Sequence, residues 1–227
     1  MYRTLFTLWL LIPVAVIVWH VGSGRDYLAA DFAGIHIRAA EKAEAEKRWS
    51  DASDAYALAA AALSENSAAH RRRLEFARAI DDIKAGQLIE GQSLLGRLID
   101  EMAEDEQSDQ QLLVAIRHEY AKAGYHAAWL MRRENVDEAV WKQQIGRAQA
   151  QFRLLAEGAV RRDENPGYRS GAFVQRESFA YKANLEAAIR LEQISSEELN
   201  EVALPAECPD CKILDQLGAN PVAVRDS

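Results

Sequence analysis

A predicted helical hairpin, residues 108–159, constrains the fold more than any other stretch of the chain. Apolar residues recur along each arm at alternating spacings of three and four, which places them on one face of a helix. The first arm carries Leu113, Ile116, Tyr120, Ala123, Ala127 and Leu130, and the second carries Trp141, Ile145, Ala148, Phe152, Leu155 and Ala159. Only residues 133–135 separate the arms. We therefore expect the arms to fold back antiparallel and to bury these faces together.

Three sequence patterns predict helix starts of the capping-box type. In this pattern a Ser, Thr or Asn precedes a Glu or Gln by three residues, and the two side chains satisfy free backbone N–H groups. The matches are Ser108-x-x-Gln111, Asn135-x-x-Glu138 and Ser195-x-x-Glu198. A further helix is expected over residues 171–193, where it would cover the last apolar face of the array.

Composition favours helix nearly throughout the chain. Five prolines and twelve glycines are few for 227 residues, and the long windows rich in Ala, Glu, Lys, Arg, Gln and Leu have high helix propensity. The formal net charge of −8 argues against a nucleic-acid partner, which would require a basic face. The sequence therefore predicts an all-α protein, and its motifs indicate neither a cofactor nor a small-molecule substrate.

The N-terminus carries an apolar run over residues 5–21, without a formal charge except at His20. A run of this length is sufficient to cross a bilayer as a helix, with Trp9 and Trp19 toward its ends. A cleaved signal peptide is the alternative, although the run exceeds the usual length of its apolar core. We expect a transmembrane anchor over residues 1–26 in a bacterial inner membrane, with the soluble body in the periplasm.

Three predicted helices carry stripes that superimpose. Shifting Trp49, Ala52, Tyr56, Ala59 and Leu63 by 39 positions gives Leu88, Gly91, Leu95, Leu98 and Met102. A further shift of 57 positions gives Ile145, Ala148, Phe152, Leu155 and Ala159. The second position is always small and the third is always large, as close helix packing requires. Repeated helix pairs are typical of an α-solenoid.

On these residues the chain resembles the tetratricopeptide-repeat (TPR) family. Ala52, Tyr56 and Ala59 match the small–large–small pattern of that family's second helix, with weaker matches at Gly91–Leu95 and Ala148–Phe152. The chain departs from the family period of 34 residues and lacks its closing proline. The resemblance implies a TPR-like array of antiparallel hairpins over residues 27–200. It also implies a non-catalytic scaffold that binds peptides or protein surfaces.

A short irregular tail is expected over residues 201–227, and it contains Cys208-Pro-Asp-Cys211. One C-x-x-C pair supplies half of a tetrahedral zinc site, and Lys212 replaces the histidine of the haem-attachment sequence. The interpretations are a local disulfide or idle thiols, an intermolecular or redox role, and metal or haem binding.

Aromatic and basic residues beside the main stripe are the candidate protein-binding site: Tyr125, Trp129, Arg132 and Arg133. An exposed Trp–Arg cluster is typical of a binding hot spot. Trp129 lies one residue from the stripe, so it either broadens the core, which is the interpretation we favour, or faces a partner.

The sequence favours a membrane-anchored, non-catalytic scaffold that holds a membrane or exported protein partner, with a role in envelope complex assembly or protein maturation. A thiol- or haem-linked maturation factor that uses Cys208 and Cys211 is the alternative. A hydrolase dependent on His118 or His126 is a third hypothesis. It is poorly supported, because no activated nucleophile is visible in the sequence.

Overall fold

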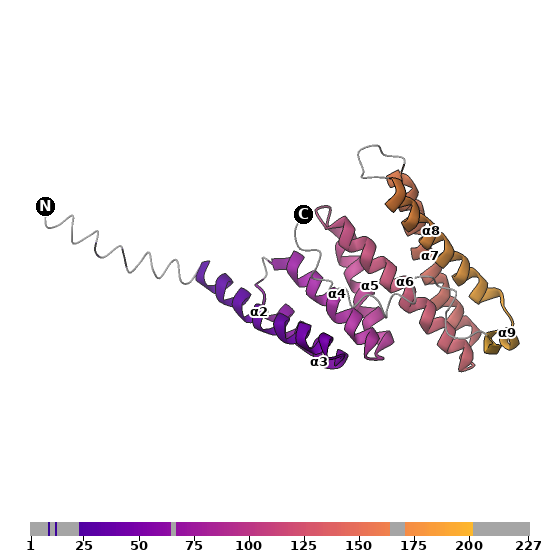
Figure 1. Cartoon of the computed structure of the whole chain (residues 1–227), viewed down its shortest axis with the longest axis horizontal. Helices are drawn as coiled ribbons and strands as arrows, with labels where there is room; N and C mark the ends of the chain where they lie inside the picture. Colours follow the sequence, from indigo (N-terminus) through magenta and orange to yellow (C-terminus); the bar gives the residue numbers. More distant parts are fainter. Residues whose placement is uncertain (1–8, 10–11, 13–22, 65–66, 164–170, 202–227) are drawn as a thin grey trace. The chain divides into compact units, whose positions relative to one another are not determined.

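The computed structural model describes residues 9, 12, 23–64, 67–163 and 171–201, and the helices there are labelled in Figure 1. These residues form helices joined by turns, without strands. The helices are α2 (Ser23–Ala45), α3 (Trp49–Ala62), α4 (Ala68–Lys84), α5 (Leu88–Glu104), α6 (Gln110–Arg133), α7 (Glu138–Asp163), α8 (Gly171–Gln193) and α9 (Ser196–Glu201). Short turns join α2 to α3, α4 to α5 and α6 to α7. The all-α prediction is confirmed, and these contiguous hairpins are consistent with a helical-repeat fold.

The predicted fold class is wrong in its transmembrane helix. None of the helices in the described part of the chain is both long and apolar enough to cross a membrane. α2 begins at Ser23, inside the predicted anchor of residues 1–26, and carries Asp31, Arg38 and Glu41, which would be costly to bury in lipid. Residues 5–21, apart from Trp9 and Ile12, lie outside the described residues, and so does the tail over residues 202–227.

The chain divides into two compact units, residues 1–78 and 79–227. The core of unit 1 joins α2, α3 and the first part of α4. It consists of Ala40, Tyr56, Ala59, Ala60, Leu74 and Ala77. Tyr56 is fully buried, and the small alanines around it allow the helices to approach closely.

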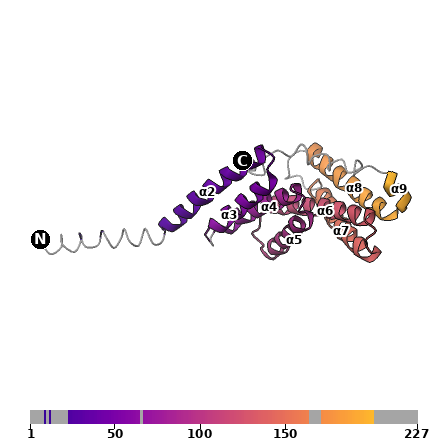
Figure 2. The ribbon, with the colours of Figure 1, turned by 90° about the horizontal axis from the view of Figure 1, so that it is seen from below.

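In unit 2, α6 packs against α5 and α7, and α7 packs against α8; Figures 1 and 2 show α7 beside α6 and α8. Every residue of the predicted second-arm stripe is buried, from Trp141 to Ala159. On the first arm, Leu113, Ile116, Ala123 and Ala127 are buried, whereas Leu130 is 40% exposed. α6 is also buried on a second face through Ala121, Tyr125, Ala128 and Trp129, because it lies between its neighbours.

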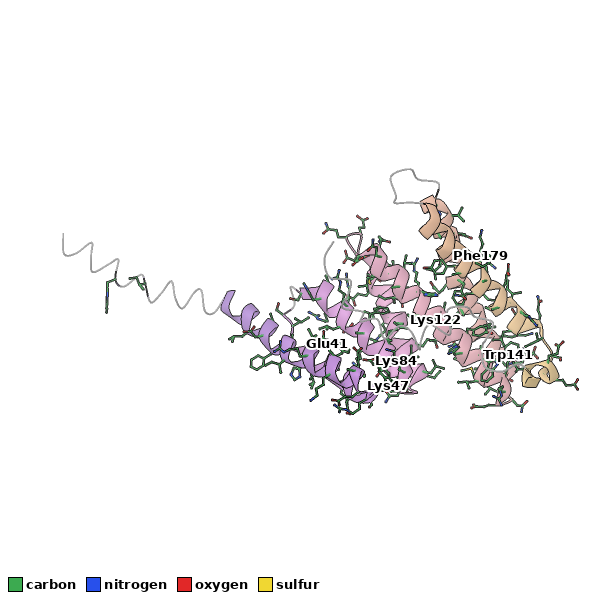
Figure 3. All side chains as sticks on the ribbon, in the orientation of Figure 1. Glu41, Lys47, Lys84, Lys122, Trp141 and Phe179 are labelled. Carbon is green, nitrogen blue, oxygen red and sulfur yellow. The ribbon has the colours of Figure 1, made fainter. Side chains whose placement is uncertain are left out.

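Helix α8 spans the predicted residues 171–193 and ends the packed layer of unit 2. Tyr181, Ala188 and Leu191 join the core, whereas Lys182, Glu186 and Arg190 are exposed. A charged outer face is what the last helix of an array requires. Phe179, labelled in Figure 3, is 75% exposed on α8.

Two aspartates outside the predicted capping boxes cap the long helices α6 and α7. The carboxylate of Asp109, not the hydroxyl of Ser108, accepts from the backbone N–H groups of Gln111 and Leu112. At α7, Asp137 accepts from Ala139 N–H at 2.8 Å. Asn135, the predicted cap, instead adopts the left-handed conformation that ends α6, with φ of 54°. The predictions for Ser108 and Asn135 are therefore wrong, because a negatively charged carboxylate directly before the helix is favoured at its N-terminus.

The third capping box is confirmed. Ser195 N–H donates to Glu198 Oε2 at 2.8 Å, and Glu198 N–H donates to Ser195 Oγ at 3.2 Å. These bonds lower the pKa of Glu198, because they stabilise its carboxylate. The box fixes the turn between α8 and α9.

Gly91 occupies the small second position of its stripe, where α5 meets the end of α4. A Cβ atom added there would lie 2.7 Å from the backbone oxygen of Ala79 and 2.7 Å from a side-chain carbon of Ile83. Both contacts are shorter than carbon atoms tolerate. A glycine is therefore required for this close approach.

We expect Gly91→Ala to lower the free energy of unfolding by about 1–3 kcal/mol, because the added methyl group overpacks the α4–α5 contact. Urea unfolding followed by circular dichroism measures the change. Gly146→Ala is the matched control, because a Cβ there meets no atom within 4 Å. It should raise stability by up to about 1 kcal/mol through helix propensity. Equal stabilisation by both substitutions would contradict the close approach.

Candidate functional site

Two of the four predicted binding residues belong to the core of unit 2. Tyr125 and Trp129 are 7% and 2% exposed, and they pack in a cluster with residues of α7 and α8. Trp129 therefore broadens the core, which is the role favoured from its position one residue from the stripe. Neither aromatic ring offers a free surface of its own.

Arg132 connects the end of α6 to the end of α8. Its guanidinium donates to the carbonyl oxygens of Leu191 and of Ile194, the second at 2.8 Å. Its central carbon also lies 4.5 Å from the ring centroid of Trp141, whose position near α9 is labelled in Figure 3. Burial lowers the pKa of Arg132 from its ordinary value. Arg132 thus closes the C-terminal end of α8, where carbonyl groups lack intrahelical partners.

Arg133 is the exposed member of the predicted set. Its guanidinium lies 4.9 Å from the ring centroid of the buried Trp129, so the indole supports it from beneath. Leu130, one turn earlier, is also exposed. We refer to Leu130 and Arg133 as the 130/133 edge. It combines an apolar side chain with a cation held on a rigid base.

A buried polar group lies at mid-length on α6, where Figure 3 labels Lys122. Lys122 is 2% exposed, and its ammonium lies 3.0 Å from Glu119 Oε1. Nδ1 of His118 is 3.9 Å from the same oxygen. Asn184 of α8, also buried, has its amide nitrogen 3.4 Å from His118 Nε2. We name these four residues the Lys122 cluster.

Lys122, Glu119 and Asn184 were not among the residues predicted to be functional. A Glu and a Lys three residues apart usually form a solvated pair on a helix surface. The useful signal is that Lys122 lies among small residues, Ala121, Ala123 and Gly124, in a helix buried on both faces. Burial on both faces brings such a lysine inside the bundle.

His118 has aromatic neighbours as well as polar ones. Its ring is edge-on to Tyr181 at 5.3 Å between centroids and to Phe152 at 6.4 Å. These contacts, with the Asn184 amide, fix the imidazole between α6, α7 and α8. The described residues include no group of three or more His, Cys, Asp or Glu arranged to hold a metal ion. The arrangement around His118 is that of a packing residue, and the hydrolase hypothesis gains no nucleophile from it.

His126 is largely enclosed, two turns beyond His118 on α6, and its Nε2 is buried without a hydrogen-bond partner among the described residues. Burial lowers the pKa of His126 from its ordinary value of 6.5, and the charge of Lys122 lowers it further. The folded protein therefore keeps this imidazole neutral at a pH where the unfolded chain protonates it.

The free energy of unfolding should consequently fall as the pH drops below about 6.5, because the unfolded state binds the proton at His126 more readily. We expect His126→Phe to remove this part of the pH dependence between about pH 7 and pH 5. Urea unfolding at several pH values measures the slope for each protein. His70→Phe is the control for a histidine outside unit 2. Equal slopes in wild type and His126→Phe would contradict the neutral, buried imidazole.

Interhelical hydrogen bonds hold the helices of unit 2 in register. Gln144 of α7 donates to the buried Gln92 of α5, next to Gly124. Gln149 donates to the carbonyl oxygen of Ala188 at 3.2 Å and to Glu192 at 2.9 Å on α8. Polar side chains in this unit therefore bind neighbouring helices to one another.

Cys208 and Cys211 lie outside the described residues, so their thiol or disulfide chemistry stays a prediction. The protein-binding role of Tyr125, Trp129, Arg132 and Arg133 is likewise untested. Comparison with known proteins gives no match to a protein-family model, to a curated protein or to a solved structure. The likeness to tetratricopeptide repeats thus remains a resemblance.

Proposed function

We propose that this protein is a non-catalytic scaffold that binds a protein partner at the 130/133 edge. The observation that supports the proposal is that some of the predicted residues stabilise the fold, whereas others are exposed. Arg132, Tyr125 and Trp129 fix the helix ends and the core, whereas Arg133 and Leu130 remain exposed on that rigid base. A surface fixed in advance loses little side-chain freedom when a partner binds.

The chemistry of the edge defines the kind of partner segment that it fits. Arg133 offers a planar set of N–H donors suited to a carboxylate, and its stacking on Trp129 limits its rotamers. Leu130 offers an apolar contact beside it. Arg and supporting Trp residues are frequent in binding hot spots. The edge would take a segment with an acidic side chain next to an apolar one.

We further propose that the hairpins form a TPR-like array. In the three superimposed stripes, the small second residues (Ala52, Gly91 and Ala148) and the large third residues (Tyr56, Leu95 and Phe152) are all buried. This is the packing that the family pattern would produce. Members of that family act as scaffolds, and by analogy the role proposed here is in assembly or maturation of other proteins. The proposal includes no membrane anchor.

Affinity capture tests the function directly. The full-length protein, tagged and expressed in its own host, is isolated beside Leu130→Ser/Arg133→Glu and beside the control Arg153→Glu, which reverses another exposed arginine on α7. We expect a stoichiometric protein partner with the wild type and the control, and at least a tenfold loss with the double variant, as removal of hot-spot residues causes. Equal recovery with all three proteins would contradict the proposed edge.

A further inference from the structure

Helix α2 of unit 1 carries an apolar stripe that the unit leaves exposed. Leu28, Phe32 and Ile35 are 50%, 60% and 53% exposed. Their spacing of four and then three residues places them on one side of the helix. Ala33 and Ala40, which are buried, lie roughly 100–130° away from this stripe around the helix axis. α2 therefore has two apolar faces, and unit 1 covers one of them.

Single exposed apolar side chains are ordinary, but three aligned on one helix indicate an interaction surface. The stripe continues into the exposed Ala39 and ends at the exposed Lys42. A small residue such as Ala39 lets a second helix approach closely, and the aliphatic stem of a lysine can cover an apolar neighbour. We name Leu28, Phe32, Ile35 and Ala39 the α2 stripe.

Two opposite charges flank the α2 stripe on the same side. At about 100° per residue, Asp31 and Arg38 lie within about 20° of each other around the helix axis. Both are exposed, and neither forms an ion pair or a hydrogen bond with another described residue. Asp31 lies one turn before Ile35, and Arg38 lies one turn after Ile35. The surface is therefore self-complementary along its length.

This order of charges selects a second copy of the same helix in antiparallel orientation. A two-fold axis passing between residues 34 and 35 brings Asp31 of one copy level with Arg38 of the other, on the same flank, and does so twice. The same axis places Phe32 of one copy between Ile35 and Ala39 of the other. Parallel packing would bring the two Asp31 side chains to the same height and leave Arg38 without an acidic partner.

We propose that two copies of this chain associate through an antiparallel α2–α2 contact, with the α2 stripes interdigitated and an Asp31–Arg38 ion pair on each side of the two-fold axis. Two-fold symmetric dimers are the commonest class of soluble homo-oligomer. A contact of one helix per copy is small, so the dimer is a weak and reversible one. This contact is independent of the 130/133 edge and its partner.

Sedimentation of the full-length protein over a range of concentrations tests the proposal. We expect a concentration-dependent dimer for the wild type and a monomer for Phe32→Asp, which places a charge in the centre of the contact. Leu58→Asp is the matched control, since Leu58 is 55% exposed on α3 and outside the stripe. It should dimerise like the wild type.

Charge reversal tests the antiparallel register. Asp31→Arg and Arg38→Asp should each raise the dissociation constant by about tenfold, since each replaces two ion pairs by two like-charge contacts. The double reversal Asp31→Arg/Arg38→Asp restores both pairs and should return the dissociation constant to near its original value. A monomer at every concentration, a dimer that persists in Phe32→Asp, or a double reversal weaker than either single variant would overturn the proposal. A different protein bound to the stripe in place of a second copy would also overturn it.

Discussion

Glu119→Ala is expected to lower the free energy of unfolding by about 3–5 kcal/mol, because it leaves the ammonium of Lys122 buried without its carboxylate. Lys122 is 2% exposed, and Glu119 Oε1 lies 3.0 Å from its nitrogen. Few single changes outside the apolar core should affect the stability of unit 2 as much. Urea unfolding followed by tryptophan fluorescence measures the effect, since Trp129 and Trp141 are buried in this unit.

The double variant Glu119→Leu/Lys122→Met removes both charges and fills the space with apolar atoms. It should recover most of the lost stability, because a buried ion pair can often be replaced by packed apolar residues at little net cost. A solvated control pair is Glu138 and Lys142, where Glu138→Ala should cost less than about 1 kcal/mol. If Glu119→Ala cost no more than Glu138→Ala, the buried Lys122 cluster would be contradicted.

Arg132→Ala is expected to lower the free energy of unfolding by about 2–4 kcal/mol, because two carbonyl groups lose a charged donor and Trp141 loses its stacking partner. The bonds to Leu191 and Ile194 close the C-terminal end of α8 and the turn into α9. The loss of stability should therefore be largest at this end of α8 and in α9. Hydrogen exchange of the wild type and of Arg132→Ala is the measurement. We expect the substitution to speed exchange at the backbone amides of α9 more than at those of α5.

Arg133→Ala is the matched control, since it removes the neighbouring arginine, which is exposed. It should change stability by less than about 0.5 kcal/mol, as is usual for surface positions. Arg132→Lys should be nearly as damaging as Arg132→Ala, because an ammonium cannot reproduce the planar fork of donors. Comparable stability of Arg132→Ala and Arg133→Ala would show that Arg132 does not fix the helix ends.

Apolar periodicity predicted the helices well because each stripe is local. The second arm of the hairpin, Trp141–Ala159, is buried as expected, and the boundaries predicted for α8 match the structure. The Ser195–Glu198 box was predictable for the same reason, since both of its bonds lie within one turn of helix.

The apolar stripes could not predict how the helices pack against one another. α6 is buried on two faces because α5 and α7 both pack against it, and a single predicted stripe accounts for one of these faces. The predictions of the first two helix caps failed for a local reason. Asp109 and Asp137, and not Ser108 and Asn135, accept from the first backbone N–H groups of α6 and α7. Apolar length alone predicted a membrane helix at the N-terminus, but the described residues contain no helix that is long and apolar enough to cross a membrane.

The candidate site was predictable in its residue types and not in their roles. Tyr125, Trp129, Arg132 and Arg133 are neighbours in sequence, but successive residues of a helix point in different directions. Arg132 consequently turns toward α8, whereas Arg133 stacks on Trp129 and stays exposed. The Lys122 cluster depends on α8, whose Asn184 is more than 60 positions away, and no local pattern reports that contact.

Site-specific photo-crosslinking tests most directly the claim that the protein works by holding a partner at the 130/133 edge. A benzophenone amino acid replaces the exposed Glu134 in one protein and the exposed Arg153 in another, so that Leu130 and Arg133 stay in place, and both proteins are irradiated in the living host. We expect a single crosslinked protein adduct from position 134 and none from position 153. Absence of an adduct at position 134, or the same adducts from both positions, would contradict the proposed edge.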